Sequence, residues 1–99
     1  MRRLIEHLYK YEYGETKNIA NIAKHDGLAL YDGIEVFFDT QRIKRRDKRF
    51  NYGERRYVTV GCAKGVILAV YFTPRGLFKR RIISVRLASR KERRVYNGR

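Results

Sequence analysis

The apolar run Val66–Phe72 is the feature that most constrains how this chain can fold. It is far shorter than the ~20 residues that a helix needs to cross a bilayer. The segment before it, Arg56–Cys62, alternates, and Lys64-Gly65 between the two is typical of a tight hairpin turn. The pattern therefore predicts a central strand over Val66–Thr73, paired with an antiparallel neighbour in the sheet that forms the core.

Three further segments are expected to be strands of the same sheet. His7–Tyr13 alternates, with Tyr9, Tyr11 and Tyr13 on one side, and predicts a first strand. Gln41–Arg46 is expected to be an edge strand, and Arg80–Leu87 follows the central strand. Because the spacings between these segments are short, we expect antiparallel neighbours.

Two helices are expected between the first strand and the rest of the sheet. The helical period predicts one helix over Glu15–His25 and a second over about Ala29–Phe38, with Leu30, Ile34, Phe37 and Phe38 facing inward. The first has two distinct faces, an apolar one with Ile19, Ile22 and Ala23 and a polar one with Lys17, Asn21, Lys24 and His25.

The end of the chain carries a clear helix-start signal. Ser89 stands three residues before Glu92, which is the spacing of a capping box, and Gly98 can close the short helix that follows. Together the segments predict one α+β domain over residues 1–99. It has an antiparallel sheet of three to five strands, two N-terminal helices and a short C-terminal helix.

The net charge points to the class of partner. The chain has 24 Lys and Arg against 10 Asp and Glu, a formal net charge of +14. Self-repulsion of this size destabilises a compact fold, so it indicates an anionic partner: a nucleic acid, a membrane surface or an acidic protein. We place nucleic acid first, because the arginines are interleaved with eight Tyr and five Phe that can stack on unpaired bases.

Cysteine usage and the N-terminus indicate the compartment. Cys62 is the single cysteine, so it can form neither an internal disulfide nor a zinc site built on a cysteine pair. The N-terminal residues 1–7 are interrupted by charge too early for a signal peptide. We therefore expect a cytoplasmic protein with no membrane partner, no metal ion and no cofactor.

Three stretches of the sequence carry motifs in a consistent order. The first is Lys17…Asn21…Lys24-His25 with a helix ending in Val36-Phe37, the second is Gly53-Glu54-Arg55 before a strand with Gly61, and the third is Arg81–Arg86 with Ala88, Arg90, Glu92-Arg93 and Tyr96. Together they resemble the BrnT toxin family. The third is the most specific, because an Arg-Ile-Ile-Ser-x-Arg-x-Ala run entering a capped Glu-Arg-x-x-Tyr helix is unusual. The family usually has Trp-Asp where this chain has Tyr13-Gly14, and Ala29 stands where a Ser or Thr cap is common.

The resemblance implies a RelE-like fold and a ribonuclease that arrests growth by cutting RNA. It also implies a BrnA-like antitoxin that covers the toxin, with operator DNA bound only through the antitoxin complex. The alternative function is a non-catalytic basic RNA- or DNA-binding protein, and a third is a subunit whose basic face meets an acidic protein. A metal-dependent nuclease is disfavoured, because the Asp and Glu are scattered among Lys and Arg without a motif.

RNA cleavage without a metal ion requires particular kinds of side chain. One group must take the proton of the 2′-hydroxyl, another must protonate the leaving oxygen, and fixed positive charge must stabilise the phosphate. We assign catalytic roles to His25, Glu54, Arg55, Arg81 and Arg86. RNA contacts are assigned to Lys17, Lys24, Arg93 and Tyr96.

Several of these residues also have a structural interpretation. Histidine is the residue type best suited to proton transfer near neutral pH, which favours a catalytic role for His25, but Lys24 and His25 could equally cap the helix C-terminus, where cations are favoured. Glu54 could organise nearby arginines or form a weak surface ion pair. The capping box accounts for Glu92, which would otherwise look catalytic. Tyr96 could stack on a base or pack inward.

Arg81 and Arg86 are separated by an odd number of positions, so their side chains point to opposite faces of a regular strand. Both can join one site only if the strand ends or bulges between them. Arg86 shares its parity with Ser84 and is favoured for phosphate binding, while Ile83, Val85 and Leu87 are expected to face the core. The basic tract Arg42–Arg49 could be a phosphate-tracking hairpin, a solvated loop or an antitoxin-docking strand.

Overall fold

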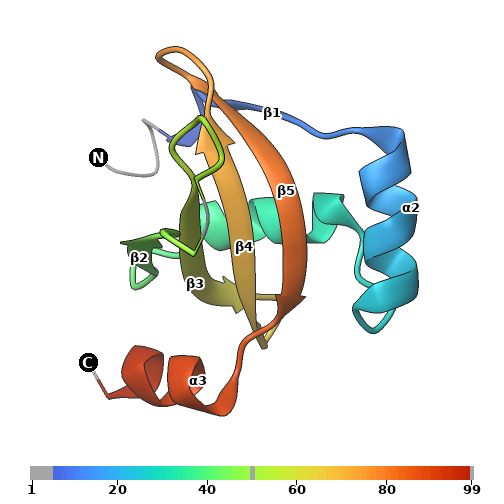
Figure 1. The fold of residues 1–99 in the computed structure, drawn as a ribbon. Helices are drawn as coiled ribbons and strands as arrows, with labels where there is room; N and C mark the ends of the chain where they lie inside the picture. Colours follow the sequence, from blue (N-terminus) through green and yellow to red (C-terminus); the bar gives the residue numbers. More distant parts are fainter. Residues whose placement is uncertain (1–5, 50, 99) are drawn as a thin grey trace.

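The computed structural model describes residues 6–49 and 51–98 and shows an α+β fold (Figure 1). Its five strands lie in the order β1-β5-β4-β3-β2. The described ranges contain three helices beside the sheet, and none of these helices is long and apolar enough to cross a membrane. The strands are β1 (Lys10–Glu12), β2 (Ile43–Arg46), β3 (Tyr57–Ala63), β4 (Val66–Pro74) and β5 (Lys79–Leu87), and the helices are α2 (Glu15–Lys24), η1 (Leu30–Phe38) and α3 (Arg90–Asn97).

The sheet is mixed, so the expectation of a purely antiparallel sheet is wrong for one pair. The two hairpin-linked pairs, β3 with β4 and β4 with β5, are antiparallel, as is β2 with β3. β1 instead runs parallel to β5, with Tyr11 opposite Arg80. Short spacing favours antiparallel pairing only for strands joined directly, and β1 reaches β5 only after the chain has passed through α2, η1 and the other strands.

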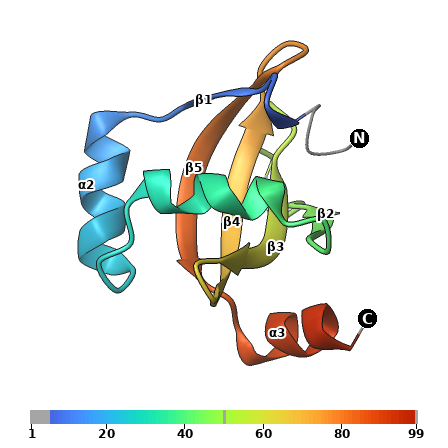
Figure 2. The same cartoon turned by 180° about the vertical axis from the view of Figure 1, so that it is seen from behind.

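The main core lies between η1 and one face of the sheet, as Figure 2 shows. The segment expected to be an α-helix is a 3-10 helix, and Gly33 allows it to lie close to the sheet. A methyl group at Gly33 would come within 2.7 Å of Val85 Cγ2 and 2.9 Å of Val70 Cγ2. Of the expected inward residues Leu30 and Phe37 are buried, whereas Ile34 and Phe38 are half-buried.

Helix α2 packs through its polar face. Asn21 is buried and its side-chain amide donates to Val85 O at 2.8 Å and accepts from Val85 N at 3.0 Å. It also donates to Leu28 O at 2.8 Å. The apolar face is left outside, with Ile19 60% and Ile22 41% exposed. The amide of Asn21 thus takes the place of a neighbouring strand along β5, beyond the short β1.

A bulge interrupts the pairing of β4 with β5. Tyr71 lies opposite Ser84 but Phe72 lies opposite Ile82, so Ile83 is the extra residue. The bulge reverses the parity of β5. Ile82 and Val85 therefore both belong to the core beneath η1, while Ile83 packs on the other face. The expected set of Ile83, Val85 and Leu87 holds only for Val85, because Leu87 is 43% exposed.

The capping box of α3 is confirmed. Ser89 Oγ accepts from the backbone N of Glu92 at 3.1 Å, and Glu92 Oε1 accepts from the backbone N of Ser89 at 2.8 Å. Helix α3 lies at one end of the sheet (Figures 1 and 2), and Gly98 is its C-cap residue. Its Tyr96 packs against a second apolar cluster on the face away from η1, formed by Val58, Val60, Ala69, Tyr71 and Ala88.

Candidate active site

A basic groove of about 230 Å³ lies on the sheet face away from η1, which is the face turned to the viewer in Figure 1. We call it the Arg86 groove. Its lining contains four Lys or Arg side chains and one Asp, so its formal charge is +3 with the histidine neutral. The end of α2, the connection between β2 and β3, and strands β4 and β5 supply its residues: Lys24, His25, Asp47, Arg49, Arg56, Tyr71, Ile83, Ser84 and Arg86.

Arg86 is held by Glu92 in a two-bond ion pair. Its Nη1 donates to Glu92 Oε1 at 2.7 Å and its Nη2 donates to Glu92 Oε2 at 2.9 Å. Arg86 Nη2 also donates to Tyr71 Oη at 2.8 Å. The hydrogen bonds that Arg86 donates to Glu92 raise the pKa of Arg86, so this guanidinium stays charged. The pair fixes the direction of the Arg86 side chain across the groove.

Glu92 stays ionised at this position. Burial raises the pKa of Glu92. Hydrogen bonds from Arg86 and from the backbone N of Ser89 lower it by more than burial raises it, and the pKa is about 2. Arg45 also donates to Glu92 Oε2, at 3.2 Å. Glu92 therefore acts as a cap for α3 and as the anchor of Arg86, and it cannot supply a proton near neutral pH.

Arg49 is anchored in the same way by a buried carboxylate. Arg49 Nε and Nη2 donate to the two oxygens of Asp47 at 2.8 and 3.0 Å. Tyr52 Oη donates to Asp47 Oδ2 at 3.1 Å. The Arg49 hydrogen bond lowers the pKa of Asp47 to about 2, against the effect of burial. Arg49 also lies over the ring of Tyr71, 4.9 Å from its centroid.

Arg56 is the third guanidinium of the groove, and Glu54 orients it. Arg56 Nε donates to Glu54 Oε2 at 3.1 Å, and Arg75 lies 3.6 Å from the other oxygen. Arg56 also lies over the ring of Tyr52 at 3.9 Å. Glu54 itself is exposed and is not among the residues that line the groove, so its position fits an organiser of arginines better than a proton carrier.

The groove contains two side chains that can transfer protons, His25 and Tyr71. His25 is the C-cap residue of α2 and lies in the groove with Lys24, so the capping and the functional interpretations are compatible. The Tyr71 hydroxyl is bonded to Arg86 and its ring lies beneath Arg49, which places this phenol among the cations. An imidazole, a phenol and fixed guanidinium groups together can deprotonate, protonate and stabilise a phosphate ester.

The structure places the remaining predicted site residues outside the groove. The bulge puts Arg81 on the same sheet face as Arg86, but Arg81 Nη1 donates to Glu12 Oε2 at 2.8 Å and does not line the groove. Arg55 is exposed, and its carbonyl accepts from Thr73 Oγ1. Lys17 is exposed on α2.

Tyr96 and Arg93, the two predicted RNA-binding residues of α3, instead form hydrogen bonds that hold this helix to the rest of the fold. Tyr96 Oη donates to Asp39 Oδ2 at 2.5 Å, and Asp39 also accepts from the backbone N of Cys62 at 2.8 Å. Arg93 Nη1 donates to the carbonyl oxygen of Ala88 at 2.7 Å. Both side chains join the C-terminal helix to the rest of the fold, and neither lines the Arg86 groove.

Sequence reasoning did not single out Arg49, Arg56 or Tyr71 for the candidate site, and Arg49 entered only as part of the tract Arg42–Arg49. Six of the eight residues of that tract are Lys or Arg, and Tyr71 lies within the apolar run of β4. The one available signal was the strand parity of Tyr71. Val58 and Val60 on β3 and Tyr71 on β4 belong to the same cluster as Ile83, on the face that carries Arg86.

The described residues offer no ready metal site. Within residues 6–49 and 51–98, no three His, Cys, Asp or Glu side chains gather where they could hold an ion. Asp47, the one carboxylate that lines the Arg86 groove, is bound by Arg49. The donor set of the groove is therefore suited to an anion and unsuited to a cation.

Two comparisons with known proteins found a match. Residues 13–92 match the family described as ribonuclease toxin, BrnT, of type II toxin-antitoxin system. The crystal structure of the Brucella abortus ribonuclease toxin, BrnT, is similar in fold with a TM-score of 0.62. The two chains share 32% identity over 83% of this chain and 99% of the Brucella chain. No curated protein sequence matches the chain.

Proposed function

Because the chain belongs to the BrnT family of ribonuclease toxins from type II toxin-antitoxin systems, we propose that it cleaves RNA in the Arg86 groove without a metal ion. The observation that carries the proposal is the composition of that groove. It combines His25 and Tyr71 with three guanidinium groups whose directions are set by carboxylate partners. Such a preorganised positive site is suited to a phosphate that gains charge during reaction.

The proposed reaction is an internal transfer of the scissile phosphate. His25 takes the proton of the 2′-hydroxyl, and the 2′-oxygen forms a bond to the adjacent phosphorus. The bond between phosphorus and the 5′-oxygen of the next nucleotide breaks, and that oxygen receives a proton from Tyr71 or from water. The products are a 2′,3′-cyclic phosphate and a free 5′-hydroxyl. Arg49, Arg56 and Arg86 stabilise the charge on the phosphate oxygens.

Cleavage of a short single-stranded RNA in EDTA tests the metal-free reaction. We expect fragments that end in cyclic phosphate or 3′-phosphate, at a rate that added magnesium does not raise. A requirement for magnesium, or products with 5′-phosphate ends, would contradict the mechanism. Binding without any cleavage under both conditions would favour the alternative of a non-catalytic nucleic-acid-binding protein.

The two histidines of the chain provide a matched pair for testing the base. His25 lines the Arg86 groove, whereas His7 lies outside it with its ring 5.4 Å from that of Phe38. We expect His25→Ala to lower the cleavage rate by about 10²- to 10⁴-fold, the usual contribution of a general base. His7→Ala should cleave at close to the wild-type rate. Equal rates for the two variants would remove His25 from the reaction.

The proposal extends to the surroundings of the enzyme. The partner is an antitoxin of the BrnA type, operator DNA is contacted only through the toxin-antitoxin complex, and the protein acts in the cytoplasm. Membership of a type II family, in which a protein neutralises the toxin, supports the partner. The α+β fold, with helices beside a sheet that presents a basic face, supports a RelE-like ribonuclease.

A further inference from the structure

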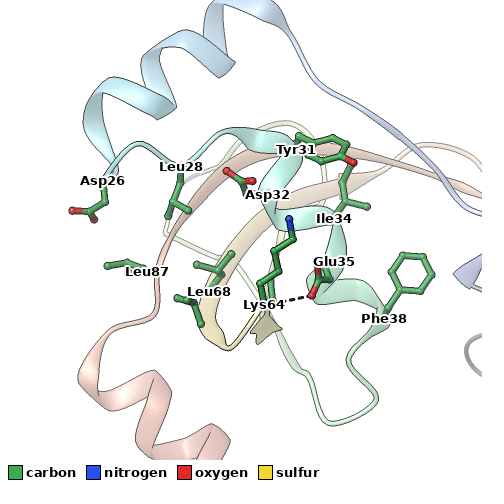
Figure 3. Close-up of a pocket in the computed structure, with 12 residues that line it drawn as sticks. Asp26, Leu28, Tyr31, Asp32, Ile34, Glu35, Phe38, Lys64, Leu68 and Leu87 are labelled. Carbon is green, nitrogen blue, oxygen red and sulfur yellow. Dashed lines mark hydrogen bonds between the residues drawn. The ribbon is translucent and has the colours of Figure 1, made fainter.

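A second groove, of about 510 Å³, opens on the opposite side of the sheet from the Arg86 groove (Figure 3). We call it the η1 groove. It lies between η1, the turn that joins β3 to β4, and the end of β5. The turn after α2 and the start of β4 also contribute to its lining.

The wall of the η1 groove is mostly apolar, and part of it is open to solvent. Tyr31 is 64%, Val66 45% and Leu87 43% exposed. Leu28 and Ile34 are half-buried deeper in the groove. Exposed apolar side chains around a hollow that is edged by charged groups are typical of a surface that binds a protein.

The charge of the η1 groove is opposite to that of the rest of the molecule. Three carboxylates and one ammonium line it, so its formal charge is −3 + 1 = −2, in a chain whose net charge is +14. The Arg86 groove, by the same count, carries +3. The phosphates of RNA are therefore favoured at the Arg86 groove over the η1 groove. The occupant of the η1 groove should be apolar with a basic edge.

Backbone groups hold two of the three carboxylates in place. Glu35 Oε2 accepts from the backbone N of Lys64 at 2.8 Å, as the dashed line in Figure 3 shows. Asp32 Oδ2 accepts from the backbone N of Ala29 at 2.8 Å. Because a backbone amide carries no net charge, these bonds orient the carboxylates without neutralising them. The carboxylates of Asp32 and Glu35 are therefore already oriented before a cationic partner binds, which lowers the entropy cost of binding.

The turn after α2 connects the two grooves. Lys24 and His25 line the Arg86 groove, and Asp26 and Leu28 line the η1 groove. The backbone N of Leu28 donates to the carbonyl oxygen of His25 at 2.8 Å. A molecule that contacts Asp26 and Leu28 therefore acts on the same tight turn that positions the imidazole of His25.

We propose that the η1 groove is the docking site of the antitoxin, and that it receives an apolar antitoxin segment flanked by Lys or Arg. The inference rests on the proposed function, since it names the partner that controls the Arg86 groove. It accounts for the location of an acidic, apolar surface on a strongly basic chain. It also provides a route by which binding on one face of the sheet disturbs His25 on the other.

Two variants with matched controls test the apolar and the charged parts of the proposal. Val66→Lys places a cation among the exposed apolar residues of the groove, and Leu77→Lys makes the same kind of change at an 85% exposed residue outside it. Glu35→Gln removes one rim charge and keeps an oxygen for the backbone N of Lys64. Glu15→Gln removes an exposed charge on α2.

The measurements are the affinity of each full-length variant for the purified antitoxin encoded next to the toxin gene, and RNA cleavage by the free toxin. We expect Val66→Lys to weaken antitoxin binding by tenfold or more, about 1.4 kcal/mol. Glu35→Gln should weaken it less and remove part of its salt dependence. Both controls should bind normally, and all four variants should cleave RNA at about the wild-type rate, with thermal midpoints confirming that they are folded.

Unchanged antitoxin affinity in both Val66→Lys and Glu35→Gln would overturn the proposal. Loss of RNA binding by the same two folded variants would also overturn it, because the groove would then be a nucleic-acid site. The proposed function fails separately: wild-type toxin that cleaves no RNA, with antitoxin binding still lost in Val66→Lys, would refute the reaction and leave the docking site standing.

Discussion

Replacing Asn21 by Ala should destabilise the protein more than any other single change on α2. The side chain is only 5% exposed and makes three hydrogen bonds, two with the backbone of Val85 and one with the carbonyl oxygen of Leu28. The substitution removes all three hydrogen bonds at once. It also leaves the N–H and the carbonyl of Val85 in the interior without the amide that satisfies them.

The expected magnitude follows from these three bonds. A hydrogen bond contributes about 0.5–1.5 kcal/mol net, and a buried donor or acceptor left without a partner costs about 1–3 kcal/mol. Partial access of water to the gap reduces the larger figure, so we expect a loss of about 3 kcal/mol. For a domain of this size that corresponds to a fall in Tm of roughly 12–24 °C, at about 4–8 °C for each kcal/mol.

Urea unfolding of Asn21→Ala, Asn18→Ala and Ile22→Ala provides the assay. Asn18 Oδ1 accepts one hydrogen bond, from the backbone N of Leu30 at 2.8 Å, so its loss should cost about 1 kcal/mol. Ile22 is 41% exposed, and its truncation should cost less than about 1 kcal/mol. If Ile22→Ala proved more destabilising than Asn21→Ala, α2 would pack through its apolar face and our description of its docking would be wrong.

Three further outcomes are expected. Gly33→Ala should lower the free energy of unfolding by about 1–3 kcal/mol in urea, because its methyl group would meet Val85 at 2.7 Å. Tyr96→Phe should lower it by about 1.5–3 kcal/mol by removing the bond to Asp39, while RNA affinity measured on folded protein stays unchanged. The carboxyl of Glu92 has its folded-state pKa lowered from 4.5 to about 2, so its contribution to stability is complete above pH 4.5 and is lost as the pH falls toward 2. Acid unfolding followed by circular dichroism should therefore show a shallower loss between pH 4.5 and 2 in Glu92→Gln than in wild type.

The parts of the fold that the sequence predicts correctly depend on residues that are close together along the chain. The capping box of α3 needs only Ser89 and Glu92, and the hairpin between β3 and β4 needs a turn that Lys64 and Gly65 form with positive φ. Both signals lie within a few residues, so local chemistry decides them. The parallel pairing of β1 with β5 depends on the path of the whole chain, and no short pattern encodes it.

Helix α2 shows why periodicity can assign a helix and still mislead about its buried face. An apolar face ordinarily turns to the core. Here the neighbour of α2 is the edge of β5, whose backbone groups at Val85 need hydrogen-bond partners more than they need apolar contact. The amide of Asn21 meets that need and Ile19 is left exposed. An expectation based on hydrophobicity alone could not include an unpaired strand edge on another element.

The Arg86 groove was predictable only in part, for a related reason. Lys24, His25 and Arg86 could be found because each stands in a recognisable local context, at a helix end or on the polar parity of a strand. Arg49 and Arg56 look like any other cation of a basic chain until the positions of their carboxylates are known. Among the residues that the structure describes, the carboxylates of Glu6, Glu12, Asp47, Glu54 and Glu92 form ion pairs with arginine.

The positive charge of this chain can have two roles, attracting an anionic polymer and stabilising one phosphate, and the ion pairs bear only on the second. The excess of cations creates a field that attracts an anionic polymer, and it needs no particular arrangement. Stabilising one phosphate during reaction needs guanidinium groups held in fixed directions, and a carboxylate partner such as Glu92 or Asp47 supplies that constraint. A carboxylate partner therefore marks an arginine whose direction is fixed, and the lining of the groove distinguishes Arg49, Arg56 and Arg86 from paired arginines elsewhere, such as Arg81. Composition alone indicates only the kind of molecule that such a surface attracts.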